Sequence, residues 1–174
     1  MTDWKDIRAF AFDVDDVATD GGVFCNEEGQ LLRTYDAKDG FAIRMARMNG
    51  YPVAVITGGS SVSILKRFRT SGIADEDVFL HSRNKMDDFR AFLDRHGLEA
   101  REVMYFGDDV PDLEVLIASG IGVAPADAAA DVIASADYVS PKPGGRGCLR
   151  EAIEKTLRIQ GRWTFDAPLY KQLF

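Results

Sequence analysis

Two aspartates, Asp13 and Asp15, stand where an apolar run of the sequence stops. Residues 7–12 (IRAFAF) read as a strand of a parallel sheet that is buried on both faces, and side chains that follow such strands line the ligand crevice of an α/β protein. One carboxylate there could attack phosphorus while the other transfers a proton. The pair could instead cap the turn that follows. Alone it indicates either phosphoryl chemistry or a capped turn.

A second acidic segment, with Asp108, Asp109 and Asp112, follows another apolar run at residues 102–107 (EVMYFG). Carboxylate oxygens are ligands that Mg²⁺ prefers. Asp109 could instead cap the helix that we expect to start at Pro111. Two acidic clusters at strand ends of one sheet predict a site for a divalent cation.

Two further segments could bind phosphate. Thr57, Gly58 and Gly59 close the apolar run at residues 53–57 (VAVIT) and precede a helix, so a hydroxyl and several backbone N–H groups could donate to phosphate oxygens. Lys85 follows a third apolar run at the start of a helix, where a lysine could equally be a solvated surface group. Each of these signals is weak when taken alone.

Strands and helices that alternate along the chain would position these residues, and this alternation predicts a three-layer, Rossmann-like α/β fold with a parallel sheet. We expect the whole chain, residues 1–174, to form a single domain. The predicted strands are 7–13, 53–57, 77–80, 102–107, 121–124 and 137–139. Apolar residues at helical spacing predict helices around residues 41–48, 64–68, 86–93, 113–117 and 147–160, and we expect these stripes to form the core.

The connection after Asp15 is too long for a simple turn. It holds two strand-like pieces on either side of residues 26–29 (NEEG), which predicts a protruding β-hairpin over residues 22–36. A two-stranded hairpin is marginally stable alone, so it needs a surface to pack on, such as a neighbouring subunit.

The C-terminal tail, residues 161–174, is rich in aromatic residues: Trp163, Phe165, Tyr170 and Phe174. Aromatic side chains beyond the last predicted helix are costly to leave in water. We therefore expect the tail to dock, either on its own domain or on a partner.

The composition is that of an ordinary globular protein, with 46% hydrophobic and 28% charged residues. A net charge of -7 disfavours binding to nucleic acid or to an anionic membrane. No apolar run approaches the roughly 20 residues that span a bilayer, and the first ten residues lack the pattern of a signal peptide. Cys25 and Cys148 have no metal-ligand spacing around them, which predicts a reduced, cytoplasmic setting.

Taken in order, the segments DxD at 13–15, Thr-Gly at 57–58, Lys85 and GDDxxD at 107–112 resemble the motif set of the haloacid dehalogenase superfamily of phosphotransferases. The resemblance implies that Asp13 is the nucleophile and Asp15 the general acid–base, with Thr57 and Lys85 holding the phosphate. It further implies a Mg²⁺ ion bound by Asp13, the backbone carbonyl of Asp15 and Asp108, with support from Asp109 and Asp112.

Residues 19–21, 36–41 and 144–151, together with the hairpin, are similar to the capless subgroup of that superfamily. Over essentially the whole chain the similarity is to its phosphatases of 3-deoxy-D-manno-octulosonate 8-phosphate, an eight-carbon acidic sugar phosphate on the route to lipopolysaccharide. This implies a homotetramer in which the hairpins associate and a neighbour's surface and tail help to close each active site. By position it implies substrate contacts from Asp36, Ala37, Lys38, Asp39, Gly40, Arg44, Gly58, Arg67 and Lys85.

Several alternatives stay open. The substrate could be a nine-carbon ulosonic acid 9-phosphate, the phosphoryl group could pass to a second substrate rather than to water, or the chain could be a non-catalytic scaffold. Arg44 and Arg67 could be solvated charges on helix faces. Two departures from the family pattern bear on these alternatives: Asp16 stands where many relatives have glycine, and Gly59 where many have arginine. The Asp16 carboxylate would repel phosphate unless it points away, although aspartate tolerates a left-handed backbone.

Overall fold

The computed structural model describes residues 3–174; residues 1 and 2, the start of the predicted domain, lie outside the described residues. Six strands form one parallel sheet in the order β5-β4-β1-β6-β7-β8. They are β1 (Ala9–Phe12), β4 (Val53–Ile56), β5 (Val78–Phe79), β6 (Val103–Phe106), β7 (Ile121–Ala124) and β8 (Tyr138–Val139). Each lies inside its predicted range, so the predicted α/β fold is confirmed.

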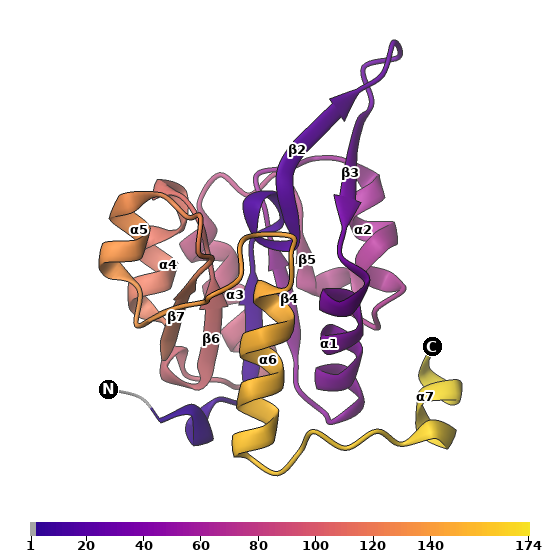
Figure 1. The fold of residues 1–174 in the computed structure, drawn as a ribbon, viewed down its shortest axis with the longest axis vertical. Coiled ribbons are helices and arrows are strands. Elements are labelled where there is room, and N and C mark those ends of the chain that lie inside the picture. Colours follow the sequence, from indigo (N-terminus) through magenta and orange to yellow (C-terminus); the bar gives the residue numbers. More distant parts are fainter. Residues whose placement is uncertain (1–2) are drawn as a thin grey trace.

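Helices cover both faces of this sheet (Figure 1). One face packs against α1 (Ala37–Met48), α2 (Val62–Arg69) and α6 (Cys148–Ile159), and the other against α3 (Lys85–His96), α4 (Leu113–Ala118) and α5 (Ala130–Ser135). Within β1, Phe10 and Phe12 point to the first face while Ala9 and Ala11 point to the second. Burial on both faces explains why the strands read as continuous apolar runs.

Strand β1 lies in the middle of the sheet, paired with β4 on one side and β6 on the other. In this register Phe12 is opposite both Val55 and Phe106. The residues that follow these three strands therefore meet at one edge of the sheet, where α/β proteins bind their ligands.

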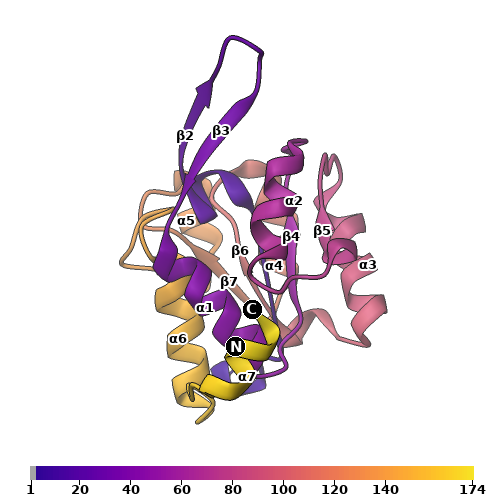
Figure 2. The ribbon, with the colours of Figure 1, turned by 90° about the vertical axis from the view of Figure 1, so that its right-hand side faces the viewer.

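The predicted hairpin leaves that edge and projects away from the sheet (Figures 1 and 2). It consists of β2 (Thr19–Cys25) and β3 (Leu31–Tyr35), and the Asn26 side chain closes its turn by accepting a hydrogen bond from the backbone N–H of Gln30 at 2.8 Å. Four apolar side chains on it stay between 43% and 66% exposed: Val23, Phe24, Leu31 and Leu32. The hairpin thus presents an apolar surface that the described chain does not cover.

The tail forms a further helix, α7 (Ala167–Leu173), which the sequence pattern did not predict. Three of its aromatic rings gather around Phe41 of α1, with centroid distances of 6.1 to 6.4 Å: Trp163, Phe165 and Tyr170. In the structure the tail therefore docks on its own domain beside α1, one of the two placements that the sequence left open (Figure 2).

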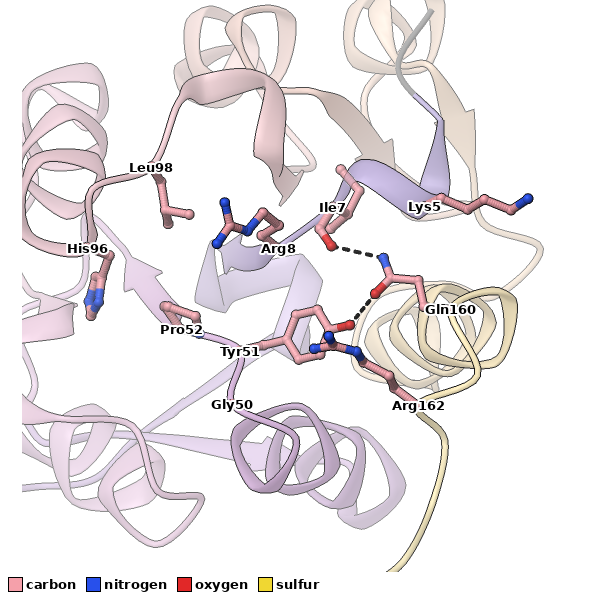
Figure 3. A pocket seen from close by; sticks show the side chains of 10 residues that line it. All are labelled: Lys5, Ile7, Arg8, Gly50, Tyr51, Pro52, His96, Leu98, Gln160 and Arg162. Carbon is pink, nitrogen blue, oxygen red and sulfur yellow. Dashed lines mark hydrogen bonds between the residues drawn. The ribbon is translucent and has the colours of Figure 1, made fainter.

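A cavity of about 460 Å³ opens at the opposite end of the sheet (Figure 3). The Gln160 amide nitrogen there donates to the carbonyl of Ile7 at 2.8 Å, and the Gln160 carbonyl accepts from the Tyr51 hydroxyl. His96 is paired with Asp77 and Arg8 with Glu102. These groups are satisfied by the protein itself, so the carboxyl edge is the stronger candidate. No helix within residues 3–174 combines the length and apolar character needed to cross a membrane.

Candidate active site

A cavity of about 530 Å³ lies at the carboxyl edge of the sheet and gathers residues that are far apart in the sequence. Its lining includes Asp13 and Asp15 after β1, Thr57 and Gly58 after β4, Lys85 after β5, and Asp108, Asp109 and Asp112 after β6. The structure therefore brings together the carboxylates, the Thr-Gly turn and the lysine that the sequence singled out.

Asp13 ends β1 and begins the tight turn at residues 14–18. Its backbone N–H donates to the carbonyl of Phe106 at 3.0 Å, which extends the sheet by one residue. Its carboxylate makes no capping hydrogen bond in that turn, lies 3.2 Å from the Lys85 ammonium, and keeps one buried oxygen, Oδ1, without a partner in the described chain. This geometry favours the chemical interpretation of Asp13 over the capping one.

Lys85 is buried between carboxylates rather than solvated. Its ammonium lies 2.7 Å from Asp112 Oδ1, an oxygen that also accepts from the Tyr105 hydroxyl. The second oxygen of Asp112 accepts from the backbone N–H of Asp108 at 3.3 Å. Burial alone would lower the pKa of Lys85, but the Asp13 and Asp112 charges outweigh it and raise that pKa. Asp112 thus fixes the lysine in place while the lysine faces Asp13.

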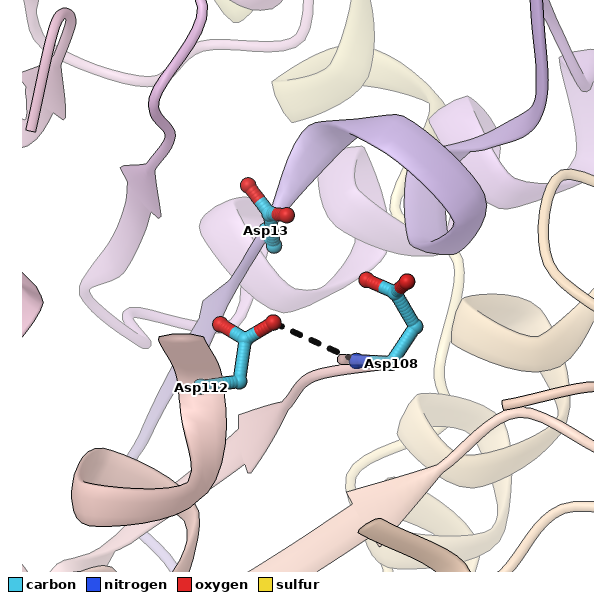
Figure 4. Close-up of side chains that lie close together, drawn as sticks. All are labelled: Asp13, Asp108 and Asp112. Atoms are coloured by element: carbon cyan, nitrogen blue, oxygen red, sulfur yellow. Dashed lines mark hydrogen bonds between the residues drawn. The ribbon is translucent and has the colours of Figure 1, made fainter. Parts of the chain in front are cut away.

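One carboxylate oxygen from each of Asp13, Asp108 and Asp112 lies within 4.8 Å of the other two (Figure 4). Burial, with added repulsion from Asp112 and Asp13, raises the pKa of Asp108 to about 8. Burial also raises the pKa of Asp13 to about 6, against the opposing effect of Lys85. Three crowded carboxylates, one lysine and an unpaired Asp13 oxygen form an oxygen-donor set that fits a hard divalent cation such as Mg²⁺.

Asp109 lies outside this group of three. Its carboxylate accepts a hydrogen bond from the backbone N–H of Val110 at 2.8 Å and so caps the short helix at residues 110–112. The geometry matches the capping alternative, and a role for Asp109 at the metal stays a prediction. Asp112, expected only in support, is the third member of the group.

Asp15 contacts a residue that the sequence did not single out, Arg33 of β3. The guanidinium donates to both oxygens of the carboxylate, from Nε at 2.6 Å and from Nη2 at 3.0 Å. It also covers Gly59, where an added Cβ would lie 3.4 Å from Nη2. The only sequence signal was a cation within the predicted hairpin, and it does not reveal that the Arg33 side chain reaches from the projecting hairpin to Asp15.

Backbone hydrogen bonds of Thr57 join the end of β4 to the segment that leads to Lys85. Its backbone N–H donates to the carbonyl of Phe79 at 3.0 Å, and its own carbonyl accepts from the backbone N–H of Ser82 at 2.9 Å. Its hydroxyl accepts from the backbone N–H of Gly59 at 3.1 Å. The turn is thereby held with Thr57 and Gly58 facing the cavity.

The segment at residues 36–40 does not line this cavity. Asp36 caps α1 by accepting from the backbone N–H groups of Lys38 and Asp39, at 2.6 and 3.0 Å. The buried Asp39 carboxylate accepts from the backbone N–H groups of Gly147 and Arg150, at 3.1 and 2.7 Å. Burial raises the pKa of Asp39 to about 6. These contacts join α1 to α6, and substrate binding by residues 36–40 stays a prediction.

Arg44 and Arg67 also lie away from the cavity. Arg44 donates to the Tyr170 hydroxyl of the tail at 2.6 Å. Arg67 donates to the Ser71 hydroxyl at 3.2 Å and lies over the Tyr35 ring. Neither arginine is a free solvated charge, and their contact with substrate stays a prediction.

Asp16 adopts the left-handed backbone that the sequence allowed, with φ of 58°. The turn is packed tightly from behind, because a Cβ on Gly144 would lie 1.9 Å from the Asp16 carbonyl oxygen. The exposed Asp16 side chain lines the cavity. Partial burial, followed by the charges of Asp127 and Asp15, raises its pKa. The carboxylate lies beside Gly21, and its charge helps to raise the pKa of Asp108, so it adds negative charge close to the cavity.

Comparison with known proteins agrees with this geometry. Residues 30–120 match the family model of haloacid dehalogenase-like hydrolases. The chain is 35% identical over 162 residues to the 3-deoxy-D-manno-octulosonate 8-phosphate phosphatase KdsC of Salmonella typhi, covering 93% of this chain and 85% of that protein.

Solved structures of the same kind superpose closely. A phosphatase of this name from Yersinia pestis gives a TM-score of 0.89 at 31% identity, covering 92% of this chain and 85% of that one. The Moraxella catarrhalis phosphatase, solved with magnesium, phosphate and KDO, gives a TM-score of 0.88 at 30% identity, covering 92% and 91%. With its strand-end carboxylates, Thr-Gly turn and buried lysine in one cavity, the chain belongs to the haloacid dehalogenase-like hydrolases.

Proposed function

We propose that the chain is a Mg²⁺-dependent phosphatase that hydrolyses 3-deoxy-D-manno-octulosonate 8-phosphate to the free sugar acid and phosphate, as a step toward lipopolysaccharide. The observation that carries the proposal is the position of Asp13. Its buried Oδ1 has no hydrogen-bond partner within residues 3–174, its Oδ2 lies 3.2 Å from the Lys85 ammonium, and Asp108 and Asp112 lie close by. A phosphoryl group placed there would meet a nucleophile and a cation together.

In the proposed mechanism Asp13 attacks phosphorus, and the bond from phosphorus to the sugar oxygen breaks. Asp15 gives its proton to that departing oxygen, which leaves an aspartyl-phosphate on Asp13. Asp15 then takes a proton from water as the water attacks phosphorus, and phosphate leaves while the Asp13 carboxylate is restored. Lys85, Thr57 and Gly58 bind the phosphate oxygens in both steps.

We propose that Asp13, Asp108 and the backbone carbonyl of Asp15 hold Mg²⁺, with Asp109 and Asp112 in support. The bound ion would offset the charge of the phosphate and of the carboxylates around it. Asp112 contributes from the protein side by holding Lys85, and Tyr105 in turn holds Asp112. The remaining substrate contacts, from residues 36–40, Arg44 and Arg67, are proposed for the sugar-acid end.

We also propose a cytoplasmic homotetramer in which hairpins associate and a neighbouring subunit, with its tail, helps to close each site. The exposed Val23, Phe24, Leu31 and Leu32 side chains of the hairpin support this assembly, because such a patch is normally covered. Cys25 and Cys148 are both free thiols, which suits a reducing compartment.

The function is tested by measuring phosphate release from a panel of acidic sugar phosphates, with and without Mg²⁺. We expect the eight-carbon ulosonic acid 8-phosphate to give the highest kcat/KM, and chelation to remove the activity. A higher kcat/KM for a nine-carbon ulosonic acid 9-phosphate would reassign the substrate. Substrate loss without free phosphate would indicate transfer to a second acceptor. No turnover of any phosphate ester would leave a scaffold role.

Asp16→Gly is expected not to lower this activity. Glycine adopts the left-handed conformation of residue 16 without steric cost, and its introduction removes a negative charge from the cavity that must accept a phosphate dianion. Steady-state kinetics should show an unchanged kcat and an equal or lower KM. A fall in kcat of more than about tenfold, the range of a general acid or base contribution, would show that Asp16 takes part in the reaction.

A further inference from the structure

The Asp15–Arg33 pair joins the catalytic turn to the hairpin. Two parallel N–H donors reach both oxygens of the Asp15 carboxylate, an arrangement that fixes the plane as well as the position of a carboxylate. The Arg33 side chain is only 4% exposed, whereas that of Asp15 is 36% exposed. The arginine therefore approaches from the protein side and leaves the outer side of Asp15 open to the cavity.

Arg33 is held in this position at a cost. Its third nitrogen, Nη1, is buried without a partner in the described chain. An unpaired buried donor destabilises a fold by about 1–3 kcal/mol, so hydrogen bonding within the hairpin does not account for this placement. The two hydrogen bonds to Asp15 account for the buried position of the Arg33 side chain.

Gly59 leaves room for the guanidinium. An added Cβ at residue 59 would lie 3.4 Å from Arg33 Nη2 and 2.9 Å from the end of the Ile64 side chain, so a long side chain would compete with Arg33 for the same space. Gly58 and Gly59 line both the catalytic cavity and an adjoining cavity of about 540 Å³ that Arg33 also lines. The base of the hairpin thus forms one wall of the site.

Asp15 needs such a support. Its side chain is 36% exposed, so packing alone does little to fix the position of the carboxyl group. Within residues 3–174, Arg33 is the only side chain that hydrogen-bonds to its carboxylate. Without that bond, rotation about the Asp15 side chain would carry the carboxyl group away from the reacting oxygen.

We propose that Arg33 is a positioning residue: from the hairpin it holds the Asp15 carboxyl group beside the departing sugar oxygen. Arg33 occupies one lone pair of each Asp15 oxygen, and the proton given to the sugar oxygen is carried on a second lone pair that faces the cavity. The inference rests on the proposed function. It makes the hairpin part of the catalytic machinery of its own subunit, in addition to any part it takes in assembly.

The test compares how much the substitution lowers kcat/KM for substrates with different leaving groups. An alkyl phosphate needs a proton from Asp15 to release its alkoxide, whereas p-nitrophenolate leaves without one. Because kcat/KM covers the steps up to phosphoryl transfer to Asp13, it isolates this proton donation. Arg33→Met should lower kcat/KM about 10- to 100-fold for the ulosonic acid phosphate and for a hexose 6-phosphate, which has no carboxylate. For p-nitrophenyl phosphate the change should stay within about threefold.

Two further variants complete the test. Arg33→Lys keeps the positive charge but cannot donate two parallel hydrogen bonds. Its kcat/KM for the two alkyl phosphates should therefore fall less than that of Arg33→Met, and its kcat/KM for p-nitrophenyl phosphate should again change little. Arg95→Met is the matched control, because it breaks an ion pair between an arginine and a buried aspartate, Asp77, away from the cavity. Any change in its kcat/KM should be the same for all three substrates.

Equal losses on all three substrates would overturn the inference and leave Arg33 a structural or phosphate-binding residue. A loss confined to the ulosonic acid phosphate would also overturn it, in favour of contact with the sugar carboxylate, as would full activity on every substrate. Failure of the proposed function is a separate outcome, because it would appear in the unaltered chain as no release of phosphate from the sugar acid.

Discussion

Asp13→Asn should reduce phosphate release by about a thousandfold or more, because an amide has no oxygen nucleophile to offer phosphorus. The change is nearly isosteric at a buried position. Lys85 retains its 2.7 Å contact with Asp112 when the Asp13 charge is removed, so we expect the fold to persist. The measurement is phosphate release at saturating substrate, with thermal unfolding followed in parallel on the same preparation.

The control is Asp94→Asn, which makes the same chemical change at an exposed position of α3 and should leave the rate unaltered. Turnover by Asp13→Asn at the rate of the unaltered chain would exclude the aspartyl-phosphate mechanism. Unfolding of the variant at ordinary temperature would instead show that Asp13 is needed for stability, and would contradict the expectation that Asp112 alone holds Lys85.

Lys85→Met is expected to damage both activity and stability. The Lys85 side chain is 8% exposed and neutralises two carboxylates that are themselves 12% and 1% exposed. Removing one partner of a buried charge network leaves the others uncompensated, which typically lowers the free energy of unfolding by about 3–5 kcal/mol. Loss of the phosphate-facing charge should cost at least about a hundredfold in kcat/KM. Denaturant unfolding and steady-state kinetics measure the two effects.

The stability loss should depend on pH in a defined direction. Lysine is charged in the folded and unfolded chains throughout the range from pH 5 to 8, so the dependence comes from the carboxylates. Asp13 and Asp108 have pKa values raised to about 6 and about 8, above their value in the unfolded chain, so each destabilises the folded state more as pH rises through its folded pKa.

Protonation at low pH removes the charge that Lys85 would have balanced. The difference in unfolding free energy between the two chains should therefore be largest near pH 8 and shrink toward pH 5. Lys66→Met, at an exposed position of α2, is the control and should show no such trend. A difference that is constant across this range would mean that Lys85 stabilises the fold through its apolar stem alone.

The sheet and the four strand-end segments could be predicted because each follows from a local pattern. Buried parallel strands give continuous apolar runs, and their carboxyl ends share one edge whatever the order of the strands. This is why Asp13, Thr57, Lys85 and Asp108 could be placed together from residues nearly a hundred positions apart.

The contacts that cross between distant elements could not be predicted in this way. Whether Asp109 or Asp112 turns toward Asp13 depends on the rotation of one short turn, which leaves no periodic signal. The bond from Arg33 to Asp15 depends on the angle at which the hairpin leaves the sheet. Helix α7 is held through the contact of its Tyr170 ring with Phe41, and a seven-residue helix has too few turns to form a clear apolar stripe.

The central place of β1 has a consequence for how the chain acquires its structure during synthesis. Both neighbours of β1 in the sheet, β4 and β6, come later in the chain, and the loop that packs against the Asp16 turn comes from residue 144. Such long-range parallel pairing makes folding slow, because the chain must close large loops before native contacts form. On the ribosome β1 would emerge before both of its partners, and its edge toward β6 would stay unpaired until Val103–Phe106 had been made. The charges of Asp13 and Asp15 at the end of β1 would disfavour association of the unpaired strand with other chains.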